Sequence, residues 1–280
     1  MQLGRYQHKV LVIDAGEGRS TWCRCYHNIL GWPEGISGET LRETGKAQAE
    51  TLGVRFKKAA VTESNATEEG FQLKVDEGGR FSAKRILFAT GIVDRMPLYS
   101  ELKDCLGISV FVCPDCDGYE VIGQRTLVLG SGNAGANMAL TLTYFTKELV
   151  YINHERRKLD EEIVEKLKEQ SIQFYNQPVS QVLTDQAKFQ GVILENGEQI
   201  HASRAFSAFG GNEIRSDLAK SLGVKLHENR HIRNDPRTKM TNVKNVWAAG
   251  DVATHSEQAV IAMGEGLQAA IWIHKSLIKR

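Results

Sequence analysis

The stretch RTLVLGSGNAG, residues 125–135, decides the fold of this 280-residue chain. Its first half is a short apolar run, which is typical of a parallel strand buried on both faces. Its second half has the Gly-x-Gly-x-x-Gly spacing and leads into residues 133–145, which favour a helix. Glycines at these positions permit a tight turn and bring backbone amides close to a pyrophosphate at the helix N-terminus. The stretch predicts a dinucleotide-binding loop; the alternative is a tight strand-to-helix turn without a ligand.

A charged segment follows the next expected strand, residues 149–153, about twenty residues after the loop. There Glu155 would accept a hydrogen bond from a free ribose hydroxyl and repel a phosphate, whereas Arg156 and Arg157 would hold a 2′-phosphate. The sequence leaves NADH and NADPH open, and a solvated helix start is the alternative for these charges. The nucleotide-binding residues predicted here are Gly130, Gly132, Asn133, Ala134, Gly135, Glu155, Arg156 and Arg157.

Strands and helices alternate along the rest of the chain as well, which predicts an α/β protein with parallel sheets. The glycines of EGG, residues 77–79, predict a hairpin turn. The other elements expected are helices over residues 39–53, 159–170 and 258–273 and strands over residues 9–14, 54–62, 85–90, 108–112, 191–195 and 242–249.

Two cysteines are separated by two residues in CPDCDG, residues 113–118. Such a pair can close a small disulfide, and mutual interaction can keep one thiol partly ionised near pH ~7. A zinc site needs about four ligands, and the chain has no second pair of this kind to complete one, so we expect no metal. We therefore predict that Cys113 and Cys116 are redox-active and that Asp117 shuttles their protons. Two inert buried thiols are the alternative.

Composition excludes several classes of function. The net charge of +1 gives no basic field for nucleic acid, and no apolar run is long enough to cross a membrane. The first residues lack a signal peptide, so the cytoplasm is the expected location, where five cysteines do not favour a structural disulfide framework. Partners should be small molecules or proteins.

Five motifs in order resemble the low-molecular-weight thioredoxin reductase family, which includes the related flavoprotein part of alkyl hydroperoxide reductase. The resemblance runs over nearly the whole chain. Its motifs are GWPEGISG at 31–38, ATG at 89–91, the Cys-x-x-Cys turn, the Gly-rich loop at 130–135, and AGD at 249–251 together with Gln258 and Ala259.

The resemblance implies two Rossmann-like three-layer nucleotide-binding domains, the second inserted in the first. Residues 1–108 and 241–280 would form the FAD domain, and residues 109–240 the NAD(P) domain with the dithiol. It further implies that electrons pass from NADPH or NADH through FAD to the dithiol and on to thioredoxin or a similar protein, in a homodimer. Cys116 would face the flavin and Cys113 attack the substrate. The FAD residues implied are Asp14, Asn28, Gly35, Ile36, Ala89, Thr90, Gly91, Gly250, Asp251, Gln258 and Ala259.

The chain departs from the family pattern at three places. The first Gly-rich loop for FAD is missing ahead of Asp14, and we expect the natural start to lie upstream of Met1. Glu155 replaces an arginine of the nicotinamide-phosphate site, which opens the alternative of a ferredoxin donor. Glu257 stands where the family has arginine. A catalytically inactive flavin- or nucleotide-binding module is the alternative from another class.

Three more cysteines lie outside the shared motifs. Cys23 and Cys25 form a Cys-x-Cys pair just ahead of the 31–38 motif. Such a pair is hard to close into a disulfide, so an extra redox station and two ordinary thiols are both open. For Cys105 we expect a packing role.

Overall fold

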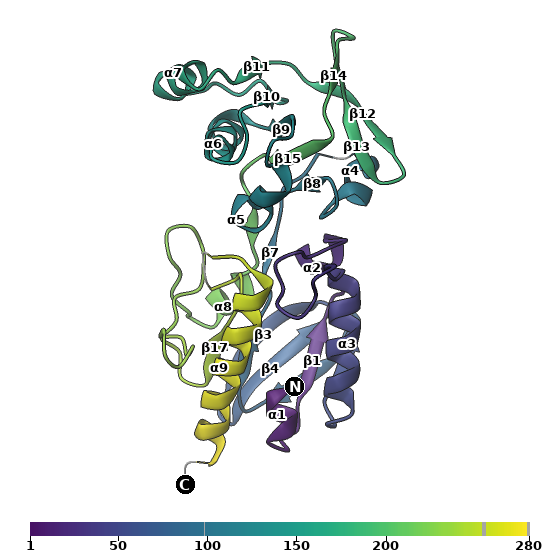
Figure 1. Ribbon diagram of the computed structural model, residues 1–280. Helices are drawn as coiled ribbons and strands as arrows, with labels where there is room; N and C mark the ends of the chain where they lie inside the picture. Colours follow the sequence, from purple (N-terminus) through teal and green to yellow (C-terminus); the bar gives the residue numbers. More distant parts are fainter. Residues whose placement is uncertain (98, 254–255, 279–280) are drawn as a thin grey trace. The chain divides into compact units, whose positions relative to one another are not determined.

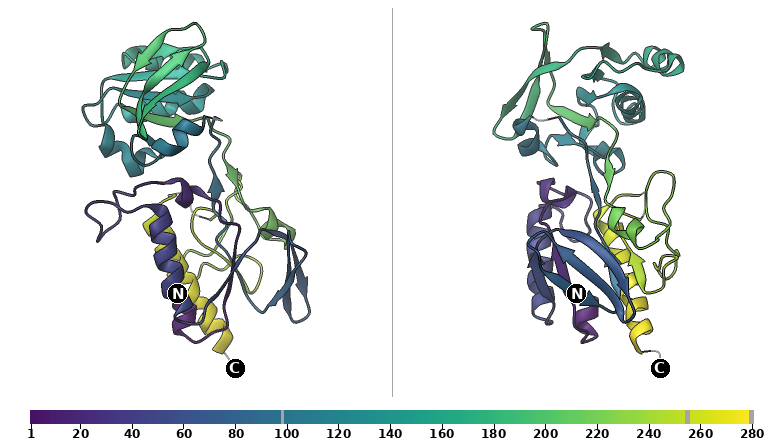
Figure 2. Two further views of the ribbon diagram at one scale, coloured as in Figure 1. Left: turned by 90° about the vertical axis from the view of Figure 1, so that its right-hand side faces the viewer. Right: turned by 180° about the vertical axis from the view of Figure 1, so that it is seen from behind.

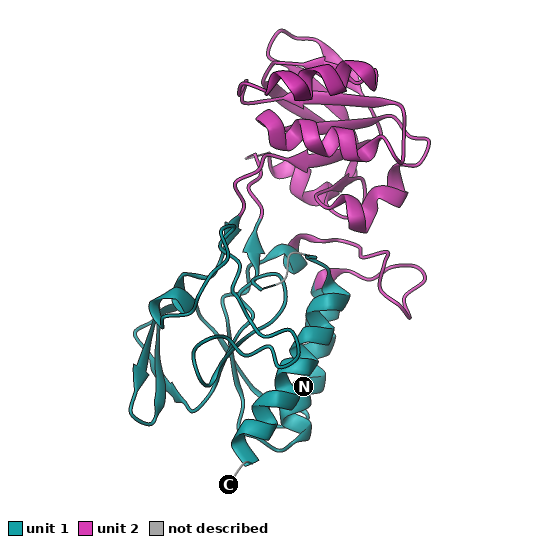
Figure 3. Ribbon diagram, turned by 90° about the vertical axis from the view of Figure 1, so that its left-hand side faces the viewer, with its two compact units in different colours: residues 1–21, 39–93, 213–280 teal, residues 22–38, 94–212 magenta. Residues whose placement is uncertain are grey.

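The computed structural model describes residues 1–97, 99–253 and 256–278 and confirms the predicted α/β fold class. The described chain divides into two compact units, coloured separately in Figure 3. Unit 1 comprises residues 1–21, 39–93 and 213–280, and unit 2 comprises residues 22–38 and 94–212.

Unit 2 is built on a five-stranded sheet in which every neighbouring pair of strands is parallel. The strand order is β11-β10-β9-β15-β8. The central strand, β9, is the apolar run that precedes the Gly-rich loop. The bounds are β8 Val110–Phe111, β9 Thr126–Gly130, β10 Leu149–Asn153, β11 Gln173–Tyr175 and β15 Arg204–Ala208.

Both faces of this sheet are covered, which is why β9 is apolar throughout. Leu127 and Leu129 pack with residues of the antiparallel strands β12–β14, whereas Val128 points the other way and packs with the helix α6. Successive residues of a strand alternate between its faces, so one strand contributes to two cores. Figures 1 and 2 show α6 and α7 on one face of the sheet and β12–β14 on the other. Unit 2 therefore has three layers.

The remaining elements of unit 2 surround this framework. The β12–β14 sheet is an antiparallel meander. The bounds are α4 Ser100–Cys105, α5 Pro114–Asp117, the 3-10 helix Gly118–Val121, α6 Gly132–Leu142, α7 Glu161–Glu169, β12 Val179–Asp185, β13 Lys188–Leu194 and β14 Gln199–His201.

Unit 1 combines two parallel strand pairs, β1 with β2 and β6 with β17, with the antiparallel sheet β3-β4-β5 and the antiparallel pair β7 with β16. The predicted turn at residues 77–79 joins β4 to β5. The bounds are β1 Leu11–Asp14, β2 Arg55–Lys58, β3 Val61–Thr67, β4 Gly70–Val75, β5 Arg80–Ala83, β6 Ile86–Phe88, β7 Ile92–Val93, β16 Glu213–Ile214 and β17 Val246–Ala248.

The long helix α9, Ala259–Ile278, runs along unit 1 and covers β17 (Figure 1). Trp247 of β17 is only 2% exposed and packs with Ala269 and Ile273 of this helix. The other helices of the unit are α1 Gln2–Arg5, α2 Arg19–Trp22, α3 Gly38–Glu50 and α8 Asp217–Ser221; the last residue of α2 and the first of α3 belong to unit 2. None of the helices that the structure describes has both the length and the apolar content needed to span a bilayer.

The structure differs from the sequence expectations at several strands. The strand expected over residues 54–62 is two strands, β2 and β3, separated at residues 59 and 60. β1, the first of the expected strands, is half-buried, because β2 is its only neighbour within the described residues. Two strands of the main sheet were not predicted: β11, at its edge, and β15, which lies between β9 and β8.

The boundaries of the compact units differ from the expected domain boundaries at residues 108 and 240. Unit 1 ends at Val93 and resumes at Glu213, where β7 pairs with β16. The segment 22–38 groups with unit 2. The division into compact units does not show which nucleotide each unit binds. The assignment of FAD and NAD(P) to these parts of the chain therefore stays a prediction.

Candidate functional site

The cysteine pair of unit 2 begins the short helix α5. Cys113 is the residue before the helix, with extended backbone, and Pro114 occupies the first turn, where its missing N–H costs nothing. The turn brings the Sγ atoms of Cys113 and Cys116 to 2.7 Å, with the Cys116 thiol donating to Cys113. Gly118 ends the turn, and a Cβ there would lie 2.4 Å from the Phe145 ring. The turn therefore holds the two thiols against each other.

Electrostatics around the pair favour one thiolate. The hydrogen bond from the Cys116 thiol lowers the pKa of Cys113 below its ordinary value. Burial, with a contribution from the neighbouring Glu120 carboxylate, raises the pKa of Asp117 to about 7. A carboxyl group with such a pKa exchanges a proton readily near neutral pH. Cys113 is thus prepared as a nucleophile beside a group that can carry protons.

The thiols of the other cysteines have raised pKa values, in contrast to that of Cys113. Burial, followed by the nearby Asp117 charge, raises the pKa of Cys23 to about 12, and burial also raises the pKa of Cys25. Neither thiol supplies thiolate at neutral pH. Cys105 is completely buried in the core of unit 2, in agreement with its expected packing role.

The Gly-rich loop has no room for side chains at two of its glycines. A Cβ at Gly130 would lie 2.6 Å from the carbonyl oxygen of Ala208, and one at Gly135 would lie 2.4 Å from the Tyr151 ring. The Gly132 N–H donates to Oδ1 of Asn153, which ties the loop to the end of β10. α6 thus begins directly at the loop, and its first amides can face an anion.

The structure brings Glu155 to this loop. Its carboxylate accepts a hydrogen bond from Ser131 at 2.6 Å, forms an ion pair with Arg95 and lies 3.1 Å from Nε of Arg157. The Ser131 hydrogen bond is the largest cause that lowers the pKa of Glu155. Arg156, by contrast, binds Glu195 at 2.5 Å. Arg95 was not predicted, because nothing in its sequence surroundings marks it.

The remaining residues of this group lie at the start of α6. Both amide atoms of the Asn133 side chain hydrogen bond to Asp160, at 2.8 and 3.1 Å. The next residue, Ala134, packs closely against Gly210. A Cβ added at Gly210 would lie 2.8 Å from the Cβ of Ala134.

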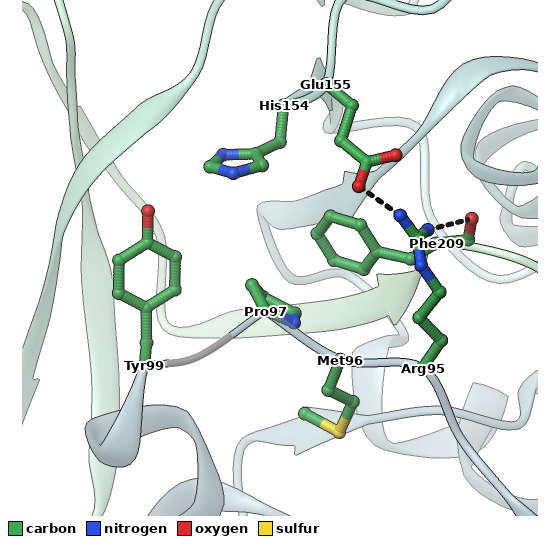
Figure 4. Close-up of a pocket in the computed structure, with 7 residues that line it drawn as sticks. All are labelled: Arg95, Met96, Pro97, Tyr99, His154, Glu155 and Phe209. Carbon is green, nitrogen blue, oxygen red and sulfur yellow. Dashed lines mark hydrogen bonds and ion pairs between the residues drawn. The ribbon is translucent and has the colours of Figure 1, made fainter.

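A pocket of about 310 Å³ opens beside Glu155 (Figure 4). Arg95 donates to the carbonyl oxygen of Phe209 at 3.2 Å, and His154 accepts the Val179 N–H at Nδ1. Burial lowers the pKa of His154, so this wall of the pocket is neutral. The lining residues are Arg95, Met96, Pro97, Tyr99, His154, Glu155 and Phe209.

Two predicted flavin motifs of unit 1 lie side by side. The parallel strands β6 and β17 end together, and the Ala249 N–H donates to the Phe88 carbonyl. The segments after them, Ala89-Thr90-Gly91 and Gly250-Asp251, therefore share one sheet edge. Gly91 and Gly250 have φ values of +65° and +76°, in the left-handed region that favours glycine. Carboxyl ends of parallel strands are where nucleotides bind in α/β folds.

Charged residues support this edge, and of these Glu265, Lys239 and Arg19 were not predicted. Glu265 of α9 accepts the Gly250 N–H at 2.8 Å and binds Lys239 at 2.8 Å. Glu257 binds Arg19 at 2.9 Å, and Arg19 also lies 3.9 Å from the Asp251 carboxylate.

The other predicted flavin residues are spread over both units. Asp14 ends β1, where it accepts the Gly16 N–H and pairs with Arg42. Gln258 and Ala259 lie at the start of α9. Asn28, Gly35 and Ile36 belong to segment 22–38 of unit 2, where Asn28 is exposed and Ile36 is buried.

A family model described as pyridine nucleotide-disulphide oxidoreductase matches residues 1–266. The thioredoxin reductase of Coxiella burnetii is 28% identical over 264 residues, which cover 87% of this chain and 81% of that protein. The thioredoxin reductase of Rickettsia bellii is 25% identical over 279 residues, with 94% and 87% covered. The thioredoxin reductase of Streptococcus pyogenes has a solved structure that superimposes with a TM-score of 0.85 at 20% identity, covering 99% and 92% of the two chains, which is a likeness of fold.

The chain is an oxidoreductase of the thioredoxin reductase type. It belongs to the pyridine nucleotide-disulphide oxidoreductase family, which confirms the resemblance found in the sequence. Membership implies FAD and a nicotinamide dinucleotide as cofactors, and the glycine positions described above fit such groups.

Proposed function

We propose that this protein is a flavin-dependent disulfide reductase that passes electrons from NAD(P)H through FAD to Cys113 and Cys116, and on to thioredoxin or a thioredoxin-like protein. The observation that carries the proposal is the pair of thiols 2.7 Å apart, with the pKa of Cys113 lowered and a proton carrier, Asp117, next to them. The names of the relatives support thioredoxin as the partner.

The dithiol performs an exchange that moves two electrons. The Cys113 thiolate attacks one sulfur of the substrate disulfide, the substrate S–S bond breaks, and the departing sulfur takes a proton. Cys116 then loses its proton and attacks Cys113 in the mixed disulfide. The second substrate sulfur leaves and is protonated, and a Cys113–Cys116 disulfide remains. Asp117, with a pKa of about 7, carries protons between these sulfurs.

The cofactors supply the electrons that restore the dithiol when they are bound. We assign the nicotinamide dinucleotide to the Gly-rich loop and the N-terminus of α6 in unit 2. We assign FAD to the sheet edge after β6 and β17 in unit 1. The homodimer and the cytoplasmic location remain predictions of this proposal.

The test is a disulfide assay on the full chain reconstituted with FAD under anaerobic conditions. NADH, NADPH and photoreduced ferredoxin are offered in turn as donors, and the thiols formed on an added thioredoxin disulfide are counted with DTNB. C113S and C116S should each abolish turnover, while C25S, a matched change outside the pair, should retain it. Wild-type turnover in C113S or C116S would remove the dithiol from the proposal, and turnover with ferredoxin alone would replace the donor.

A further inference from the structure

Three arginines stand around the end of β10, and each already binds a carboxylate. Arg95 and Arg157 both face Glu155, and Arg156 faces Glu195. Glu155 also accepts the Ser131 hydroxyl, so a residue of the Gly-rich loop itself fixes its position. The carboxylate therefore lies between two guanidinium groups and next to the dinucleotide loop.

This arrangement has a consequence for the ribose of the bound dinucleotide. A 2′-phosphate carries a charge of about −2 and needs cations with vacant donors. Here the carboxylate of Glu155 occupies the space between Arg95 and Arg157 and repels a phosphate. A free 2′-hydroxyl, in contrast, can donate a hydrogen bond to the same carboxylate.

Arg95 is fixed in this arrangement from a second direction. Its guanidinium donates to the Phe209 carbonyl at 3.2 Å and lies 6.0 Å from the centre of the Phe209 ring, and its backbone N–H donates to Asn212. Burial keeps the neighbouring His154 neutral by lowering its pKa, so His154 adds no cation. The pair of Arg95 and Glu155 is thus a built feature of unit 2.

We propose that Glu155 makes the dinucleotide site selective for NADH over NADPH by filling the position of the 2′-phosphate between Arg95 and Arg157. The inference rests on the proposed function, because it assigns the Gly-rich loop to a nicotinamide dinucleotide. The inference goes beyond the proposed function, because it names NADH as the electron donor and Glu155 as the residue that selects this donor.

The test is calorimetric binding of two probes to the full chain, ADP-ribose and 2′-phospho-ADP-ribose. Wild type should bind ADP-ribose about tenfold more tightly or better, since repulsion between like charges costs at least that factor. E155Q removes the charge and frees both guanidinium groups, so it should raise the affinity for the phosphorylated probe about tenfold. The double variant E155Q/R157Q should lose most of that gain.

E162Q is the matched control, because Glu162 also binds a cation, Lys166, but on the exposed face of α7. It should leave the preference unchanged. Wild-type protein that binds 2′-phospho-ADP-ribose as tightly as ADP-ribose, or that binds neither probe, would overturn the inference. The readout needs neither flavin nor dithiol, so a chain that prefers ADP-ribose but reduces no disulfide would refute the proposed function alone.

Discussion

The substitution Asp117→Asn should stabilise the folded protein relative to wild type. The gain in stability should be larger at alkaline pH than at acid pH. The Asp117 carboxyl group is partly buried near Glu120, and its pKa rises to about 7 on folding. Asparagine has nearly the same shape but no charge to bury. The variant therefore removes the cost of ionising this position and changes little else.

The magnitude follows from the change in pKa. An unfolded aspartate ionises near pH 3.8, so folding raises the pKa by about 3 units, and each unit corresponds to about 1.4 kcal/mol. Below pH ~4 both states are protonated and the cost is absent. As the pH rises towards 7, the unfolded state loses its proton first, and wild-type stability falls. The gap between D117N and wild type should grow to at most about 4 kcal/mol at pH ~8.

Urea unfolding of both proteins at about pH 5 and about pH 8, followed by circular dichroism, measures this gap. Asp115 is exposed on the same short helix, so D115N controls for the loss of a negative charge. In D117N, disulfide reduction should also lose the part of its pH dependence that falls near pH ~7. A gap between D117N and wild type that is the same at both pH values would refute the argument.

Three further outcomes are expected. In urea titrations, Gly130→Ala should lower the free energy of unfolding by about 1–3 kcal/mol, because its Cβ would lie 2.6 Å from a backbone carbonyl oxygen. Gly264→Ala is the control: this glycine lies within α9 with open space around it, so the change should raise the free energy of unfolding by about 0.5–1 kcal/mol. Lys239→Met should cost about 3–5 kcal/mol by the same assay, since it removes the cation from the largely buried Glu265 carboxylate and leaves it only the Gly250 N–H; a loss below 1 kcal/mol would contradict this. Iodoacetamide should label Cys113 well before Cys23 in peptide mass maps of reduced protein, because the pKa of the first thiol is lowered and that of the second is raised to about 12.

Local patterns in the sequence were sufficient for the main elements of the fold. The strand β10 has the predicted bounds, and the helices expected at residues 133–145 and 159–170 are present as α6 and α7, each a few residues shorter. Residues 204–208 were missed, although RAFSAF is an apolar run of the kind found in buried strands. A short apolar run of this kind cannot be told from a buried helix segment by its periodicity alone, although Gly210 and Gly211 follow it directly.

The local geometry of the candidate site was predictable where it depends on neighbours in sequence and not where it depends on tertiary contacts. The turn at Cys113 and Cys116 and the loop at residues 130–135 are local, so their spacing was enough. Arg95 and Glu265 reach their partners only after strands and helices from distant segments have packed. Their pairing depends on geometry that no sequence window contains.

The burial of Trp247 under α9 has a spectroscopic consequence. The chain has four tryptophans; Trp247 and Trp272 belong to unit 1, and Trp22 and Trp32 belong to unit 2. An indole that is 2% exposed emits at shorter wavelength than one that is 43% exposed, as Trp32 is. The fluorescence of Trp247 should therefore shift to the red when unit 1 unfolds. Variants that keep only one unit's tryptophans would record the unfolding of each unit separately.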